Sequence, residues 1–180
     1  AQYAALSQEA GLVPVVEPEV LMDGDHSLER CAEATTAALE AVYEALYLYG
    51  VYLEGTLLKP NMVIQGKAHA IQASAKEVAV ATVEVLKRTV PSAVPGIVFL
   101  SGGQTPAQAT ENLNEMNKLG DLPWQLSYSY GRALQDEALK AWLGKPENVP
   151  AAQKQFHRRA RYTSLSRTGS YKPEMEKQPA

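Results

Sequence analysis

The chain has 180 residues, of which 46% are hydrophobic and 21% charged, and its formal net charge is −3. This size and composition allow one globular unit with a buried core, while the mild negative charge argues against a nucleic-acid-binding surface. The single cysteine cannot form an internal disulfide, and no apolar run reaches the roughly 18 residues of a membrane span. We therefore expect a reducing compartment, no nucleic-acid partner and no membrane span.

The spacing of apolar residues predicts strands and helices in alternation. The predicted strands are 13–20, 51–58, 96–101 and 125–130, and the predicted helices are 27–49, 74–90, 131–142, 150–165 and one that begins at 105. Ser74 with Glu77 forms a capping box, and Thr105-Pro106 suits a helix cap and first turn. Pro14 is unusual within a strand and indicates a special context.

Four strand–helix units in succession predict an α/β fold with a parallel sheet, because each parallel pair needs a crossover. A barrel and an open doubly wound sheet both satisfy this order. In both, ligand-binding residues follow the carboxyl ends of the strands. That rule selects Glu17 and Glu19, then Lys59, then Ser101 with Gly102 and Gly103, and finally the segment from Ser129 to Arg132.

Two strand ends offer groups for covalent and acid–base chemistry. Lys59 ends an apolar strand, where a desolvated lysine becomes a nucleophile towards carbonyls, although a lone lysine there is more often a surface residue. Glu17 and Glu19 share one face of the first strand and can act together in proton transfer. A solvated acidic strand end is the simpler interpretation, but Pro18 between them modestly favours a function.

The other two strand ends offer groups for a phosphate. Ser101-Gly102-Gly103 precedes a helix, so backbone amides and a positive helix terminus are available to an anion, although a tight turn alone explains two glycines. Arg132, beside Gly131, can bind the same phosphate through paired hydrogen bonds, although a surface arginine is the commoner case.

The remaining polar clusters predict no chemistry. The three histidines lack the spacing of metal ligands, so the sequence predicts no metal site. Arg158, Arg159 and Arg161 are interpreted as the solvated face of a helix.

Four segments together resemble a known family. They are Val15-Val-Glu-Pro-Glu19, Leu53-Glu-Gly-Thr-Leu-Leu-Lys-Pro-Asn-Met62, Phe99-Leu-Ser-Gly-Gly-Gln104 and Ser129-Tyr-Gly-Arg-Ala-Leu134. In this order and spacing they resemble class I fructose-1,6-bisphosphate aldolase, from Ala1 to about Tyr171. The resemblance implies a TIM (β/α)8 barrel of which this chain covers about the last four β/α units. It also implies reversible cleavage of fructose 1,6-bisphosphate to dihydroxyacetone phosphate and glyceraldehyde 3-phosphate in glycolysis and gluconeogenesis.

The resemblance implies a role for each strand end. Lys59 forms an imine with the ketose carbonyl, so that no metal or other cofactor is needed. Glu17 serves the acid–base steps of imine formation, and Glu19 matches a neighbouring active-site carboxylate. The residues that bind the ketone-side phosphate of the sugar-phosphate substrate are Leu100, Ser101, Gly102, Gly103, Ser129, Gly131 and Arg132.

The resemblance also implies that half of the barrel is missing. Residues 1–166 are expected to form the C-terminal half, and residues 167–180 a polar, flexible tail in which Tyr171 has no catalytic role. The N-terminal half would supply an aspartate, further lysines and an arginine, so this half alone is expected to be inactive. Because half a barrel leaves open sheet edges, we expect a partial sequence or closure by another chain. A cytoplasmic homotetramer is expected, with a plastid location possible.

Two alternatives stay open at this point. The first is a different Schiff-base lyase on the same barrel, which agreement at both phosphate-binding segments disfavours. The second is a catalytically incomplete fragment that acts as a binding or assembly subunit.

Overall fold

A computed structural model describes residues 1–177 of the chain. The sheet has four parallel strands: β1 (Val15–Val16), β2 (Leu57–Leu58), β3 (Gly96–Phe99) and β4 (Gln125–Tyr128). The helices are α1 (Gln2–Glu9), α2 (Leu28–Leu48), α3 (Ala75–Thr89), α4 (Pro106–Lys118), α5 (Arg132–Trp142) and α6 (Val149–Ser166). Three short 3-10 helices complete the fold: η1 (Leu53–Gly55), η2 (Pro146–Asn148) and η3 (Pro173–Lys177). No helix of this described part is long and apolar enough to cross a membrane.

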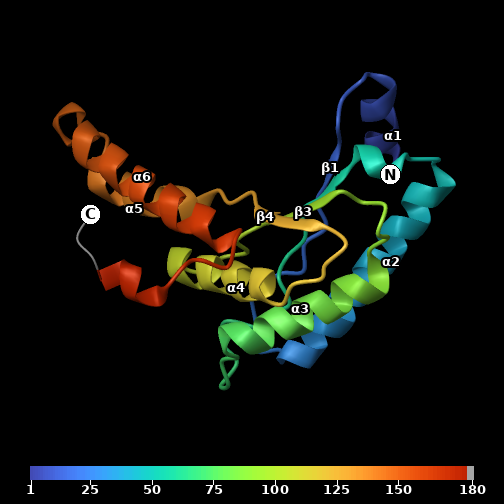
Figure 1. The fold of residues 1–180 in the computed structure, drawn as a ribbon, viewed down its shortest axis with the longest axis horizontal. Coiled ribbons are helices and arrows are strands. Elements are labelled where there is room, and N and C mark those ends of the chain that lie inside the picture. Colours follow the sequence, from blue (N-terminus) through green and yellow to red (C-terminus); the bar gives the residue numbers. More distant parts are fainter. Residues whose placement is uncertain (178–180) are drawn as a thin grey trace.

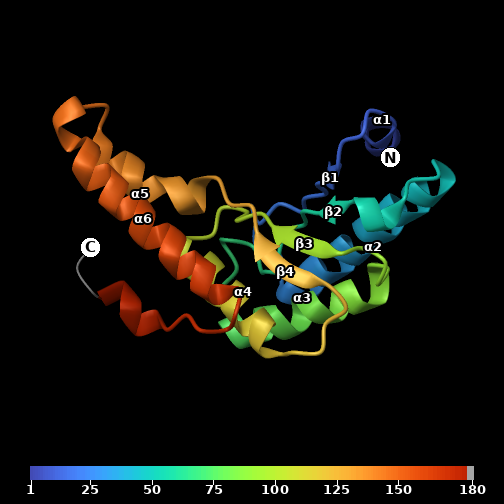
Figure 2. The same cartoon turned by 45° about the horizontal axis from the view of Figure 1, so that its top comes forward.

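The strand order decides between the two architectures that the sequence allows. The order is β1-β2-β3-β4, so each crossover leads to the next strand on the same side. A doubly wound sheet reverses its direction at a switch point, whereas a barrel adds strands in sequence. Helices α2, α3 and α4 lie on one face of the sheet, and α5 and α6 extend from it as a pair (Figures 1 and 2). The arrangement is that of consecutive β/α units of a barrel.

The helices begin where the capping residues predict. Ser74 and Glu77 form the expected capping box of α3, and Thr105 and Gln108 form another at the start of α4. Ser27 caps α2 by accepting a hydrogen bond from the Arg30 amide at 3.3 Å. Each cap satisfies amides that the first helical turn leaves without partners.

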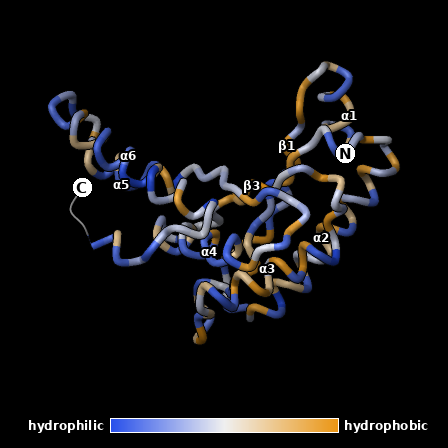
Figure 3. The backbone as a smooth tube through the Cα atoms, in the orientation of Figure 1, coloured by the Kyte–Doolittle hydropathy of each residue, from blue (hydrophilic) through white to orange (hydrophobic). Residues whose placement is uncertain are grey.

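The main core lies between the sheet and the helices that cover it. Leu58, Ile97 and Phe99 of the strands pack against α3 and α4 residues such as Leu86 and Leu113, all at most 1% exposed. Figure 3 shows hydrophobic residues along α2 and α3, whereas the α5 and α6 pair is largely hydrophilic. The core therefore holds the strands from the side that the helices cover, and so fixes the positions of the strand ends.

The first two strands are shorter than the sequence predicts. Pro14 and Pro18 flank β1, and proline cannot donate to the ladder of a sheet. Before β2, the Tyr52 backbone is held by the Gln8 side chain from α1, at 2.7 and 3.0 Å. No sequence pattern predicted α1, which supplies this side chain and so replaces part of the expected strand.

The loops after β1 and β2 are joined by backbone hydrogen bonds. The donors are the amides of Gly66, Lys67 and Ala68, and the acceptors are the carbonyls of His26, Met22 and Gly24, at 2.8–2.9 Å. A Cβ atom on Gly66 would lie 2.3 Å from the Gly24 oxygen. Only glycine fits there, so this position sets how closely the two loops approach.

Residues 167–177, the described part of the tail predicted for residues 167–180, pack against α4 and α6, and the flexibility of the tail stays a prediction. Tyr171 is 2% exposed, and its amide donates to Asn114 Oδ1 at 2.9 Å. The Tyr162 hydroxyl donates to the Met175 carbonyl at 2.8 Å. Residues 178–180 of the predicted tail lie outside the described residues.

Arg159 corrects an expectation, because it is buried rather than part of a solvated helix face. It is 1% exposed and donates to both carboxylate oxygens of Glu176, at 2.7 and 2.8 Å, and to those of Glu137 at 3.2 Å. Its neighbour Arg161 is exposed, as predicted. A charge run alone does not show which member faces inward, because the carboxylates that compensate it are distant in sequence.

Candidate functional site

The ends of β1 and β2 bring the predicted nucleophile and acid–base group together. Lys59 Nζ lies 2.8 Å from Glu17 Oε1, with side-chain exposures of 19% and 52%. Val16 pairs with Leu58 in the parallel register, so the next residue of each strand falls on the same face. The Lys59 amide also donates to the Val16 carbonyl at 2.7 Å. The pair is therefore positioned by the backbone of both strands.

Glu19 is near this pair in sequence but does not join it by a direct contact. Its side chain is exposed, and it makes no hydrogen bond or ion pair within residues 1–177. The segment itself is held by Asn61, whose Oδ1 accepts from the Val20 amide at 2.9 Å. Asn61 Nδ2 in turn donates to Thr35 of α2 at 3.0 Å. Asn61 had no predicted role, although it stands two residues after Lys59.

The third predicted segment lies beside Lys59 along the same edge of the sheet. The Leu100 amide donates to the carbonyl of Pro60, the residue after Lys59, at 3.1 Å. Leu100 and Ser101 are both buried. The turn that follows closes with the Gln104 amide on the Ser101 carbonyl at 3.0 Å.

Gly102 and Gly103 form the centre of this turn. Their φ angles are +55° and +78°, the combination of a type I′ turn, which glycine adopts without strain. Neither amide donates to another group within the described chain. The turn therefore leaves two backbone donors available to an anion.

The fourth segment contributes an open helix start. The Ser129 amide donates to the Phe99 carbonyl at 2.9 Å, which places this segment next to the third. Helix α5 begins after Gly131 without a side-chain cap, unlike α2, α3 and α4. Ser129, Gly131 and Arg132 are all exposed. The uncapped amides and a nearby guanidinium are suited to an anion.

Buried Tyr130 anchors this segment to α4. Its hydroxyl donates to the Ala109 carbonyl at 2.9 Å. Burial, and secondarily Tyr128, raise the pKa of Tyr130 well above its usual value, so it remains a neutral donor. The exposed residues on either side of it are thus fixed to a rigid helix.

One cation at the phosphate segments was missed by the sequence analysis. Lys67 Nζ lies against the backbone of Gly103, so closely that a Cβ on this glycine would be 2.8 Å from it. It also pairs with Asp23 Oδ1 at 3.3 Å. Lys67 stands in an irregular loop well after the strand end, where no periodic pattern marks a residue as inward or functional.

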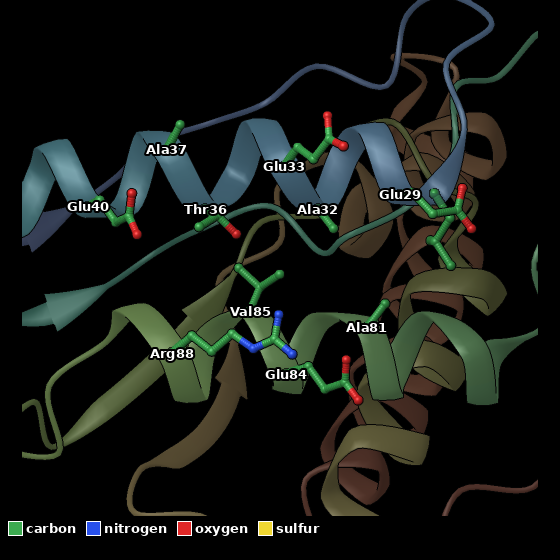
Figure 4. A pocket seen from close by; sticks show the side chains of 11 residues that line it. Glu29, Ala32, Glu33, Thr36, Ala37, Glu40, Ala81, Glu84, Val85 and Arg88 are labelled. Carbon is green, nitrogen blue, oxygen red and sulfur yellow. The ribbon is translucent and has the colours of Figure 1, made fainter.

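The groove between α2 and α3 is a different feature, away from the strand ends (Figure 4). Alanine, threonine and valine side chains contribute to its lining, together with four glutamates and one arginine: Glu29, Glu33, Glu40, Glu84 and Arg88. None of the residues of the four candidate segments lines it. Its predominantly negative charge repels a sugar phosphate, so the strand ends are the better site for one.

No group of three or more histidine, cysteine, aspartate or glutamate side chains within residues 1–177 is arranged to hold a metal ion.

Comparison with known proteins identifies relatives over nearly the whole chain. Residues 1–180 match the family described as fructose-bisphosphate aldolase class-I. The chain is 57% identical over 174 residues to a fructose-bisphosphate aldolase, non-muscle type, of Lethenteron camtschaticum. It is 58% identical over 172 residues to fructose-bisphosphate aldolase B of Gallus gallus. These matches cover 96% and 95% of the chain but only 48% and 47% of the relatives.

A solved structure shows the same relationship in three dimensions. The fructose-bisphosphate aldolase of Plasmodium falciparum, solved in complex with TRAP and a small molecule inhibitor, superposes with a TM-score of 0.93 at 50% identity. The match covers 95% of this chain and 49% of that one. The four parallel strands and their helices therefore correspond to the last four β/α units of a TIM barrel. The chain spans about half the length of the relatives it matches, and it belongs to the class I fructose-bisphosphate aldolase family.

Proposed function

We propose that this chain supplies the imine-forming and ketone-phosphate-binding half of a fructose-bisphosphate aldolase. The observation that carries the proposal is the contact of Lys59 Nζ with Glu17 Oε1 at 2.8 Å, beside a turn with two available amides. A nucleophile and a proton carrier at adjacent strand ends are what imine formation requires. The family to which the chain belongs makes fructose 1,6-bisphosphate the proposed substrate.

The chemistry begins with transfer of a proton from the Lys59 ammonium to Glu17. The neutral amine adds to the ketose carbonyl carbon, and one proton of its nitrogen passes to the former carbonyl oxygen. Glu17 then returns its proton to the resulting hydroxyl, which leaves as water, and an iminium remains on the lysine. Cleavage of the carbon–carbon bond then sends its electron pair into the iminium, which becomes an enamine. The other fragment leaves as an aldehyde when its hydroxyl loses a proton. Lys59 takes the role of electron sink, so class I chemistry uses no metal cofactor.

The ketone-side phosphate is proposed to lie between the third and fourth segments. The amides of Gly102 and Gly103, the start of α5 at Gly131 and the Arg132 guanidinium provide donors on neighbouring strand ends. Lys67 adds a second positive charge at the Gly103 backbone. Binding energy from this remote phosphate orients the carbonyl against Lys59. Glu19 is proposed as a nearby carboxylate of the same site.

The whole reaction is proposed to need a second half of the barrel. Strands β1 and β4 each pair on one side only within the described residues, so both edges are open to further strands. Half a barrel lacks the groups that the family places on the other half, and we propose that it has no turnover alone. Completed, the enzyme is proposed to be a homotetramer in the cytoplasm, with a plastid form as the alternative location.

Trapping of the imine tests the proposed function. The protein is a completed chain, in which residues 1–180 follow the N-terminal half of the Gallus gallus relative. With dihydroxyacetone phosphate and borohydride, we expect a reduced adduct on Lys59 and none in Lys59→Met. Lys118→Met, which removes an exposed lysine paired with Glu115, should trap as the unchanged chain does. An adduct on another lysine, or none, would refute the mechanism.

The isolated 180-residue chain tests the half-barrel proposal separately. Its aldolase turnover should be undetectable, and addition of the N-terminal half in trans should raise it. Turnover by the isolated chain at the rate of the completed chain would contradict this part of the proposal and leave the role of Lys59 intact.

A further inference from the structure

A short series of buried amide groups lies behind the turn at Ser101. Asn112 of α4 donates through Nδ2 to Gln104 Oε1 at 2.7 Å. Gln104 Nε2 then donates to the Ser101 carbonyl at 3.0 Å. Asn112 is 5% exposed and Gln104 is 7% exposed. Two polar side chains are therefore placed in the interior, where their strong partners within residues 1–177 are each other and the turn.

The hydrogen bond from Asn112 decides which way the Gln104 amide faces. A carboxamide has one accepting oxygen and one donating nitrogen, and the oxygen is engaged by Asn112. The nitrogen must then face the Ser101 carbonyl and the nearby Met62 sulfur, which is 3.5 Å away. Without Asn112, nothing fixes the amide oxygen, and the side chain is free to rotate so that its nitrogen no longer donates to the carbonyl.

The Ser101 carbonyl in turn decides the direction of the Gly102 amide. Both belong to one planar trans peptide, in which C=O and N–H point in opposite directions. The carbonyl accepts both the Gln104 backbone and side-chain nitrogens at 3.0 Å, and it is thereby held towards the interior. The N–H of Gly102 is consequently held towards the outside, where it has no partner within the described chain.

We propose that Gln104 and Asn112 are positioning residues for the ketone-side phosphate. They touch no substrate; they orient the Ser101–Gly102 peptide so that its N–H points at the phosphate before the phosphate arrives. This inference rests on the proposed function, because it concerns the same phosphate. The two buried amides would thus contribute to the preference of the site for phosphorylated over unphosphorylated ketones.

A purely structural role for the two amides predicts a different outcome. Buried amides that only satisfy one another stabilise the fold, and their loss then affects phosphorylated and unphosphorylated ketones alike. The measurement that separates the two roles is the phosphate preference. It is the ratio of borohydride trapping efficiencies on Lys59 with dihydroxyacetone phosphate and with dihydroxyacetone.

In the completed chain, Gln104→Leu and Asn112→Leu should each lower the phosphate preference about 10-fold, the effect of one misdirected hydrogen bond to a charged group. Trapping with dihydroxyacetone should stay within about twofold, because Lys59 is untouched. Asn117→Leu is the matched control. It removes a part-buried amide of the same helix that bonds to Ser166 at 3.1 Å, so it should lower stability without changing the phosphate preference.

Gln104→Glu gives a second test, in which one variant is followed as the pH changes. A carboxylate cannot donate to the Ser101 carbonyl, but a protonated carboxyl can, and burial favours the protonated form. The phosphate preference of Gln104→Glu, divided by that of the unchanged chain at the same pH, should therefore rise as the pH falls. Gln104→Leu should show no such recovery.

A pH-independent ratio for Gln104→Glu, or equal losses with both ketones, would overturn the positioning role. Failure of the unchanged chain to trap either ketone on Lys59 would instead refute the proposed function. If the completed chain without substitutions traps both ketones on Lys59, and the variants keep its phosphate preference, only this inference is refuted.

Discussion

The Lys59 ammonium and the Glu17 carboxylate lie 2.8 Å apart although 42 residues separate them in the chain, with Lys59 the more buried partner. The Val16–Leu58 pair of the parallel ladder sets their common face, and Asn61 ties the β1 end to α2. The backbone register of the two strands does not depend on these two side chains, so it persists when one of them is changed. Substitutions at this pair therefore report on chemistry more than on folding.

Glu17→Gln should slow imine formation in the completed chain about 100-fold, because a carboxamide cannot take the proton from Lys59. Single-turnover trapping with dihydroxyacetone phosphate measures this rate. The control is Glu33→Gln, which removes an ion pair to Arg30 of similar length, 2.9 Å, on an exposed helix face. Equal trapping rates for Glu17→Gln and the unchanged chain would exclude Glu17 from the acid–base steps.

Gly103→Ala should weaken the phosphate preference about fivefold, or roughly 1 kcal/mol. An added Cβ would meet Lys67 Nζ at 2.8 Å and push this cation from the turn. Gly120→Ala is a matched control, because Gly120 also has a positive φ, of +64°, but no atom within 4 Å of an added Cβ. Both variants should lose about 1 kcal/mol of stability from backbone strain, measured by urea unfolding. Only Gly103→Ala should lower the phosphate preference. An equal decrease of the phosphate preference in both variants would assign the effect to backbone strain alone.

Glu176→Gln should lower the free energy of unfolding by about 2 kcal/mol, because Arg159 is left buried with a weaker set of acceptors. Arg159 has 2% side-chain exposure and Glu176 has 21%, so little solvent screens the pair. The exposed Glu174, two residues earlier, supplies the control Glu174→Gln, which should be within about 0.5 kcal/mol of the unchanged chain. Urea unfolding of the completed chain measures both. Similar losses in the two variants would contradict a specific role for the buried pair.

The same carboxylate predicts how stability changes with pH. Burial opposes the charge of Glu176, but hydrogen bonds from Arg159 and Tyr171 outweigh it and lower its pKa below the ordinary 4.5. In the window between the two values the unfolded chain binds more protons, so stability rises with pH there. Its contribution is complete above about pH 4.5 and is lost as the pH falls through the folded-state pKa. The free energy of unfolding between pH 3 and 6 should therefore change less with pH in Glu176→Gln than in the unchanged chain. Equal changes with pH in the two proteins would contradict the role of Glu176.

Much of the fold follows from local signals in the sequence. The capping boxes at Ser74 and Thr105 mark two helix starts, and the succession of units predicts the parallel sheet. The strand lengths were overestimated, because the Gln8 side chain takes backbone bonds of Tyr52 that a longer β2 would use. Such a partner is 44 residues away, where periodicity gives no information.

The strand-end rule selects Lys59 and Glu17, and the structure places these two side chains in contact; their catalytic roles stay predictions. The burial of Arg159 was not predicted, because a polar helix segment resembles a solvated surface until its charge partners are known. Gln104 ends the third of the four segments that resemble the family, but no role was predicted for it. Its direction depends on Asn112, eight residues away in α4, and no property of either residue type reveals that contact.

The backbone bonds between the loops after β1 and β2 make the lengths of these loops interdependent. The Glu17–Lys59 contact fixes their beginnings, and the Gly66 amide on the His26 carbonyl, at 2.9 Å, fixes their far ends. One inserted or deleted residue in either loop would displace every later bond relative to the other loop. Relatives that keep this contact should therefore vary here by substitution or by paired changes of length, and seldom by a single insertion.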